Sequence, residues 1–331
     1  MAEDKHHVQL GLTDDDVIEM YKTMLLARKL DERMWLLNRA GKIPFVVSCQ
    51  GQEAAQVGSA YALDRDKDYV APYYRDLGIV LAFGMSAKDI MLSGFAKAED
   101  PNSGGRQMPG HFSQKKNRII TGSSPVTTQV PHAVGFALAS KLQQKEFVTL
   151  TALGDGSTNQ GDFHEALNFA GVHKLPVITI VQNNRLAISV PYEKQIASET
   201  IAVRAKSYGM PGYVVDGNDP LAVYEVVKEA RQRAINQEGP TLVEAVTVRL
   251  TAHSSDDNDR VYRSEAELEE AKKKDCIQTF AKYLFKNSVL TEELNKELNK
   301  QLDEVVNKAT EYAENAAFAD VKTIHDFVYE R

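Results

Sequence analysis

Two apolar segments with a helical stretch between them constrain the fold of this chain most strongly. Residues 147–153 (FVTLTAL) and 176–181 (PVITIV) have the composition of buried strands, and residues 162–174 have that of a helix. A strand, a helix and a second strand form a βαβ unit, in which both strands run parallel. The same order recurs in residues 213–215, 220–237 and 240–250. We therefore predict an α/β fold, with a doubly wound, mostly parallel sheet covered by helices on both faces.

Helical segments flank this alternation at both ends of the chain. Thr13 is followed by three aspartates, which is typical of a helix start, and Gly41 and Pro44 are expected to end that helix. After Tyr262 the sequence becomes charged, helical in pattern and almost free of glycine. We predict an N-terminal helical extension over 1–45, an α/β domain over 46–262 and a C-terminal helical section over 263–331 that packs on the same domain.

Charge and composition exclude several classes of protein. The 331 residues contain 39 Lys and Arg against 46 Asp and Glu, a formal net charge of -7, so no excess of basic residues favours nucleic acid. No segment is apolar enough to span a bilayer, and the first thirty residues do not resemble a signal peptide. We expect a cytoplasmic chain with no membrane or nucleic-acid partner, and buried thiols at Cys49 and Cys276.

The candidate site lies where the two strands of the first βαβ unit end. The sequence GDG (154–156) follows the first strand and NN (183–184) follows the second, so both motifs are expected at the carboxyl edge of the sheet. Asp155 and Asn184 offer carboxylate and amide oxygens, which Mg²⁺ prefers, and a backbone carbonyl just beyond Asn184 could be a third ligand. Such a Mg²⁺ ion usually completes its shell with phosphate oxygens, so a diphosphate is implied. We expect the glycines of this turn, including Gly161, and the following helix N-terminus to cradle it.

Other motifs for catalysis and nucleotide binding are not found in the sequence. The glycine spacing is not G-x-G-x-x-G, and the sequence contains no P-loop, no G-x-S-x-G and no H-E-x-x-H. Glycine, aspartate and asparagine are also common turn residues, so GDG or NN alone could be a turn without function. The pair, at the ends of two neighbouring strands, favours the cofactor site.

The sequence from Gly154 to Ser189 resembles the thiamine diphosphate motif, GDG to NN, of the thiamine-dependent enzymes. From about Asp14 into the C-terminal helices, the chain resembles the alpha subunit of the decarboxylating component of 2-oxo acid dehydrogenase complexes. GGRQMPGHF (104–112) and SSPVTTQ (123–129) resemble the branched-chain enzymes more than the pyruvate enzymes. The resemblance implies a thiamine diphosphate-binding fold and oxidative decarboxylation of branched-chain 2-oxo acids, with reductive acylation of a lipoyl group.

The resemblance also assigns roles to residues around the cofactor. It implies that Asp155, Asn184 and the backbone carbonyl of Leu186 hold Mg²⁺, and that Tyr74 and Arg75 bind the diphosphate together with the turn of Gly154 and Gly156. Some members of the family place an arginine on the diphosphate where this chain has Gln182.

Two further groups of residues match the loop that precedes the first βαβ unit. Ser124 and Val126 stand where the aminopyrimidine of the cofactor is contacted in the family. Ser123, Thr128 and Gln129 match a monovalent cation site, which would hold K⁺. The alternative for these three residues is a polar turn without an ion.

Two histidines are the catalytic candidates. His253 follows the strand expected at 240–250, so it can reach the reacting end of the cofactor, and an imidazole can move protons near neutral pH. The resemblance implies that it also contacts the cofactor and contributes to acyl transfer to lipoate. His111, in MPGHF, is the second candidate. A surface position for His253 and an ordinary loop position for His111 are the alternatives.

The acid that activates the aminopyrimidine in this family lies in a second domain, which a chain of this length does not contain. The resemblance therefore implies a beta subunit in an α₂β₂ assembly and a separate lipoyl-bearing acyltransferase, with a small 2-oxo acid as substrate. Pyruvate or acetoin dehydrogenase chemistry is the first alternative. A non-catalytic interaction subunit, in which GDG and NN are remnants, is the second.

Overall fold

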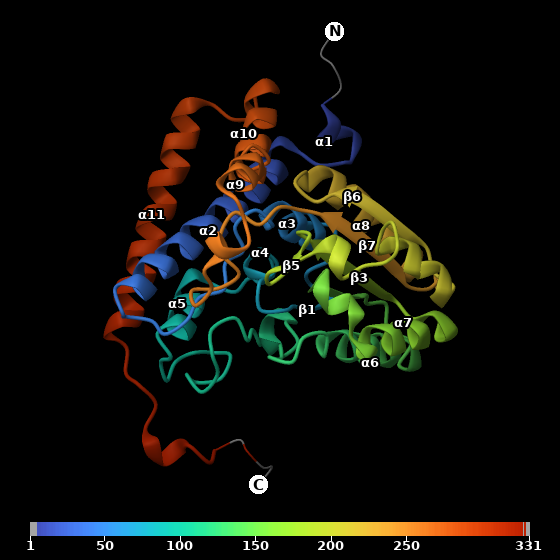
Figure 1. The fold of residues 1–331 in the computed structure, drawn as a ribbon, viewed down its shortest axis with the longest axis horizontal. Coiled ribbons are helices and arrows are strands. Elements are labelled where there is room, and N and C mark those ends of the chain that lie inside the picture. The colour runs from blue at the N-terminus through green and yellow to red at the C-terminus, as the bar shows by residue number, and fades with distance from the viewer. Residues whose placement is uncertain (1–4, 327, 329–331) are drawn as a thin grey trace.

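A central parallel sheet organises the computed structural model, which describes residues 5–326 and 328 (Figure 1). The strands are, in spatial order, β1 (Tyr69–Ala71), β2 (Thr149–Gly154), β3 (Val177–Asn183), β7 (Thr241–Val246) and β6 (Gly212–Asp216). Every neighbouring pair in this sheet is parallel. A separate antiparallel hairpin joins β4 (Leu186–Ala187) to β5 (Val190–Pro191). The α/β fold with a mostly parallel sheet is therefore confirmed.

The central strands bury both of their faces. Successive side chains of a strand point to opposite faces, so Leu150 and Ala152 of β2 enter one hydrophobic cluster and Leu153 enters another. The first cluster includes α3 (Glu53–Tyr61) and α8 (Pro220–Ile235), and the second includes α6 (Gln129–Leu142) and α7 (Gly161–His173). Figure 1 shows these two pairs of helices on opposite sides of the sheet. Burial on both faces explains why β2 and β3 are almost continuously apolar.

The other helices surround this arrangement. The long helices α2 (Asp14–Arg39) and α11 (Glu292–Asn315) lie together at one side of the molecule (Figure 1), and both contribute to the same cluster as α3 and α8. The remaining α-helices are α1 (His6–Gln9), α4 (Leu77–Ala82), α5 (Ala87–Gly94), α9 (Glu265–Lys272) and α10 (Cys276–Lys286). Short 3₁₀ helices are Lys115–Asn117, Gly156–Asn159, Tyr192–Lys194, Ala202–Tyr208, Asp259–Val261 and Val321–Thr323.

Helix α2 begins and ends as its sequence predicts. The Thr13 hydroxyl accepts a hydrogen bond from the Asp16 backbone N–H at 3.1 Å, and the Thr13 backbone N–H donates to the Asp16 carboxylate at 2.8 Å. This reciprocal capping box satisfies two backbone donors at the start of the helix. The helix ends at Arg39, and Gly41 takes a positive φ of 68°, which glycine adopts without strain.

Some boundaries differ from the sequence predictions. Strand β7 ends at Val246 and not at residue 250, because the chain beyond it leaves the sheet and the Leu250 N–H donates to the Gln50 carbonyl at 3.2 Å. Helix α11 runs from Glu292 to Asn315, within the C-terminal section that the sequence predicts to be helical. In the part of the chain that the structure describes, no helix is both long enough and apolar enough to cross a membrane.

Candidate active site at the carboxyl edge of the sheet

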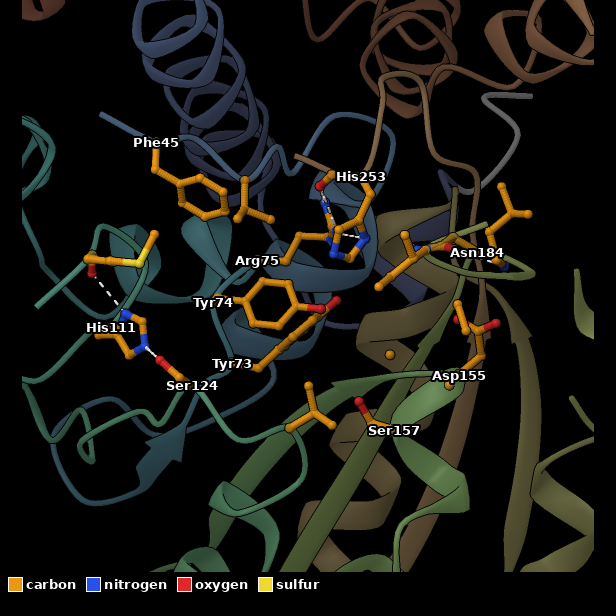
Figure 2. A pocket seen from close by; sticks show the side chains of 18 of the residues that line it. Phe45, Tyr73, Tyr74, Arg75, His111, Ser124, Asp155, Ser157, Asn184 and His253 are labelled. Carbon is orange, nitrogen blue, oxygen red and sulfur yellow. Dashed lines mark hydrogen bonds between the residues drawn. The ribbon is translucent and has the colours of Figure 1, made fainter. Parts of the chain in front are cut away.

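A cavity of about 480 Å³ opens where β2 and β3 end. Figure 2 shows Asp155 and Asn184 on one side of it, His111 and Ser124 on the other, and Tyr74 between them. All the residues predicted as catalytic or cofactor-binding line this cavity: Tyr74, Arg75, His111, Ser124, Val126, Gly154, Asp155, Gly156, Asn184, Leu186 and His253. The fold thus brings together residues that are far apart in the sequence, since Tyr74 and His253 are separated by 179 positions.

Asp155 is an almost fully buried carboxylate at the end of β2, with 1% of its surface exposed. The Gln195 side-chain amide donates to its Oδ2 at 2.8 Å. Burial raises the pKa of Asp155 to about 6, because the charged form loses hydration. A cation at this position would stabilise the ionised carboxylate, so the group suits a metal ligand.

Asn184 lies on the same side of the cavity as Asp155, after β3, in a tightly turned loop. Its side-chain oxygen accepts the Leu186 backbone N–H at 3.1 Å, and Arg185 between them has a positive φ of 65°. This local bond orients the amide oxygen and leaves it a second lone pair. The loop also presents Leu186 to the cavity.

The loops after β2 and β3 approach each other closely at Gly156. A Cβ atom at Gly156 would lie only 2.6 Å from the Ala187 Cβ, whereas one at Gly154 would meet no atom within 4 Å. Within residues 5–326 and 328, no cluster of three His, Cys, Asp or Glu side chains could hold a metal. A cation here would therefore depend on one carboxylate with amide and carbonyl oxygens, a donor set that fits Mg²⁺.

The turn that faces the cavity is formed by residues 154–157, which line it, and the short 3₁₀ helix starts within this turn at Gly156. Gly161, expected in the same cradle, is exposed at the start of α7 and is not among the lining residues.

Arg75 is 2% exposed and is held by protein groups on two sides. Its guanidinium donates to the Ser48 carbonyl and, at 3.2 Å, to Nδ1 of His253. It also lies over the Tyr74 ring, with 5.5 Å from Cζ to the ring centroid. These contacts fix a cation at the cavity wall, beside a phenol that can donate a hydrogen bond.

Gln182, by contrast, does not line the cavity. It is fully buried at the end of β3, where its amide nitrogen donates to Asp76 at 2.5 Å. Its side-chain oxygen accepts from Gln56 at 3.0 Å and from the Tyr73 hydroxyl at 3.4 Å. Its hydrogen bonds therefore join a network beneath the cavity.

His253 is neutral in this environment. Burial, with the charges of Arg75 and Arg249, lowers its pKa to about 4. Because a guanidinium can only donate, Nδ1 of His253 must accept from Arg75, and the proton of the neutral ring resides on Nε2. The His253 backbone N–H donates to Asp257 at 2.7 Å, which anchors the residue at the start of its loop.

His111 and Ser124 form a hydrogen-bonded pair on the opposite wall. Nδ1 of His111 lies 2.8 Å from the Met108 carbonyl, which can only accept, so this nitrogen carries a proton. In the neutral ring Nε2 then accepts from the Ser124 hydroxyl. A predicted catalytic residue and a predicted cofactor contact are therefore joined directly.

The three residues of the expected K⁺ site lie beside the cavity and do not line it. The Thr128 hydroxyl donates to the Pro125 carbonyl at 3.0 Å, as in a polar turn. The Gln129 amide is buried and donates to the Ala152 carbonyl at 2.8 Å. Ser123 is half-buried. The K⁺ site stays a prediction.

Several lining or supporting residues were not predicted. Phe45, Val47 and Met108 form apolar parts of the wall, and no motif marks them. Gln195, which contacts Asp155, lies in a loop without a pattern. Arg249 is a buried cation that donates to the Ile188 carbonyl at 3.0 Å. The only indication of Arg249 in the sequence is its charge within the mostly apolar segment 240–250.

Comparison with known proteins agrees with this geometry. Residues 21–322 match the family described as dehydrogenase E1 component. The chain is 63% identical over 325 residues to the 2-oxoisovalerate dehydrogenase subunit alpha of Bacillus subtilis (strain 168), covering 98% of both chains. It is 38% identical to the pyruvate dehydrogenase E1 component subunits alpha of the same organism and of Staphylococcus aureus (strain Mu50 / ATCC 700699), covering 97% and 96% of this chain and 84% of each relative. The chain therefore belongs to the dehydrogenase E1 component family.

Proposed function

We propose that this chain is the alpha subunit of a branched-chain 2-oxo acid dehydrogenase, which uses thiamine diphosphate with Mg²⁺. The observation that carries the proposal is the single cavity in which Asp155 and Asn184 face Arg75 and His253. The 63% identity to the 2-oxoisovalerate dehydrogenase subunit alpha supports the substrate class.

Mg²⁺ would be held by Asp155, the Asn184 amide oxygen and the Leu186 carbonyl. Tyr74 and Arg75 would donate hydrogen bonds to the diphosphate together with the turn of Gly154 and Gly156, and the open space beside Gly154 leaves room for it. Ser124 and Val126 would contact the aminopyrimidine, and a K⁺ ion bound by Ser123, Thr128 and Gln129 would support that loop. When bound, the cofactor supplies the electron sink for decarboxylation.

The histidines would serve the acyl-transfer part of the reaction. His253 is neutral and carries its proton on Nε2, so it can donate a hydrogen bond to a developing negative charge at the reacting end of the cofactor. His111 carries its proton on Nδ1 and shares its other nitrogen with Ser124. It therefore orients this wall of the cavity as well as offering a second imidazole.

The apolar wall supports a branched substrate. Phe45, Val47, Met108 and Ile188 line the cavity and can surround an aliphatic side chain. Pyruvate lacks that side chain, and each missing methylene in such a pocket typically costs roughly 10- to 200-fold in specificity. We expect 2-oxoisovalerate to be preferred over pyruvate by about 100-fold in kcat/KM.

Catalysis would need a beta subunit that completes the cavity, in an α₂β₂ assembly, and a lipoyl-bearing acyltransferase that accepts the acyl group. The test is to purify the chain alone and together with the candidate beta subunit, and to measure decarboxylation over a panel of 2-oxo acids. We expect the chain alone to be inactive and the assembly to be active. Robust decarboxylation by the isolated chain would contradict the proposed division of the site.

The same assembly separates the alternatives. Preference for pyruvate or acetoin would replace the branched-chain assignment and keep the cofactor chemistry. Failure to bind thiamine diphosphate in a calorimetric titration with Mg²⁺ would favour a non-catalytic interaction subunit.

A further inference from the structure

Asp31 is a fully buried carboxylate in the middle of α2, outside the cavity. It accepts three hydrogen bonds from one turn of the chain. The Ser48 hydroxyl donates to it at 2.9 Å, the Cys49 backbone N–H at 2.6 Å and the Gln50 side-chain amide at 2.8 Å. One carboxylate therefore fixes both the backbone and two side chains of residues 48–50.

One carbonyl group of this turn contacts a residue that lines the cavity. The Ser48 carbonyl accepts the Arg75 guanidinium, which also contacts Nδ1 of His253 at 3.2 Å and its carbonyl at 3.4 Å. A continuous series of hydrogen bonds thus connects Asp31 to Arg75 and His253.

The segment that contains the turn contacts the His253 loop a second time. The Val46 carbonyl accepts the Ser255 N–H at 2.8 Å, and the Gln50 carbonyl accepts the Leu250 N–H at 3.2 Å. Phe45 and Val47 of the same segment line the cavity. Movement of residues 45–50 would therefore move part of the wall together with the anchor of His253.

Burying Asp31 has a cost in stability. Within the residues that the structure describes, it forms no ion pair, and burial raises its pKa to about 6. An apolar residue would avoid this cost but would leave the Cys49 N–H without an acceptor. Such an arrangement is expected where holding the turn in one position matters more for function than the stability that is lost by burying the carboxylate.

We propose that Asp31 is a positioning residue for this site, because its carboxylate holds the turn at residues 48–50 and thereby fixes the Arg75 guanidinium against His253. The inference rests on the proposed function for its effect on turnover. The mechanical connection itself depends only on the contacts within this chain.

The test compares Asp31→Asn with Asp68→Asn in the assembled component. Asp68 is also a fully buried carboxylate that accepts backbone N–H groups, from Asp64 and Val148, but it lies at the opposite end of the sheet. We expect Asp31→Asn to lower kcat at saturating cofactor by about 10-fold, with KM for the 2-oxo acid within about 2-fold. Asp68→Asn should leave kcat within about 2-fold while lowering the unfolding temperature.

A second measurement needs no cofactor. Hydrogen–deuterium exchange, followed by mass spectrometry, reports how often the amides of each segment open. In Asp31→Asn we expect faster exchange both at residues 46–50 and at residues 253–255, whereas Asp68→Asn should accelerate neither. If Asp31→Asn does not fold, Ser48→Ala removes one of the three donors and should produce the same pattern with a smaller loss of about 3-fold in kcat.

The outcomes separate this inference from the proposed function. Faster exchange confined to residues 46–50, or a kcat equal to that of the wild-type assembly, would overturn the positioning role of Asp31. Failure of the wild-type assembly to bind thiamine diphosphate would overturn the proposed function. Coupled exchange at 46–50 and 253–255 would then still support the connection between the two segments.

Discussion

A buried carboxylate lies at each end of the central sheet, and the two carboxylates have different hydrogen-bond and charge partners. At the amino end, Asp68 accepts N–H groups from Asp64 and Val148, each at 2.8 Å, and pairs with Arg231 at 2.6 Å. At the carboxyl end, the Gln195 amide donates to Asp155, and burial raises the pKa of Asp155 to about 6. Removing one partner of a buried ion pair leaves the other charge uncompensated and destabilises the fold. Asp155 also lines a cavity, and it forms no ion pair within the described residues, so a cation could bind there. The comparison favours a structural role for the amino end of the sheet and the proposed functional role for its carboxyl end.

The largest expected effect comes from removing each carboxylate in turn. Asp155→Ala should weaken binding of thiamine diphosphate with Mg²⁺ by more than about 100-fold, because it removes the charged metal ligand, and should leave the fold intact. Asp68→Ala should do the reverse: about 3 kcal/mol lower stability, with cofactor affinity retained. Calorimetric titration and denaturant unfolding of both variants measure the two effects. Equal cofactor affinity in Asp155→Ala and wild type would remove the metal assignment.

A variant of His253 tests catalysis at the functional end of the sheet. His253→Ala should keep cofactor binding and lose about 100-fold in the lipoyl-dependent assay, since a positioned hydrogen-bond donor to the developing charge is removed. An artificial electron acceptor bypasses lipoate, so activity in that assay should fall less. Unchanged activity in both assays would identify a surface histidine. A higher cofactor requirement in both would identify a diphosphate ligand.

A variant of Asn184 tests whether the charge of a proposed metal ligand decides how much that ligand contributes to cofactor affinity. Asn184→Ala removes a neutral oxygen, so cofactor affinity should fall by about 10-fold, less than in Asp155→Ala. The same calorimetric titration compares the two. Identical losses of cofactor affinity in both variants would mean that the charge of the ligand does not decide its contribution. Full activity in both variants would exclude the proposed metal site.

A further expected effect, on the pH dependence of stability, concerns Asp76, a second buried carboxylate at the functional end. Burial raises its pKa to about 7 from 3.8, so the folded chain holds a proton that the unfolded chain releases. Stability from this proton is fully present below pH 4 and is lost as the pH rises through 7, by about 1.4 kcal/mol per pH unit. Denaturant unfolding between pH 4 and 8 should show a shallower decline in Asp76→Asn. Parallel curves for wild type and variant would contradict the assigned shift.

The parts of the fold that sequence could predict are those with a strong local pattern. Strands β2 and β3 are apolar on both faces, and the turn residues after them fall at the same sheet edge, so Asp155 and Asn184 could be placed together. Strand β1 has only three residues, which is too short for a periodic pattern. Helix α3 is buried almost all round and rich in small residues, so it has no polar face to mark it.

The cavity wall away from the proposed metal ligands Asp155 and Asn184 could be predicted only in part. Tyr74 and Arg75 are assigned only through resemblance to a family, whereas His253 is also expected at the site because it follows a strand that ends at the same sheet edge. Their supports join residues far apart in the chain, as when the Ser48 carbonyl meets Arg75. Such contacts depend on how α2 and the sheet pack, and no short sequence pattern records them.

The contact between Arg75 and His253 determines which nitrogen of this imidazole can face a reactant. With Nδ1 occupied by a permanent donor, only Nε2 is left to hydrogen-bond to a reactant. The low pKa means that the ring holds a single proton near neutral pH. His253 therefore acts toward a reactant as a neutral hydrogen-bond donor and not as an acid, because loss of its one proton would leave an imidazolate anion.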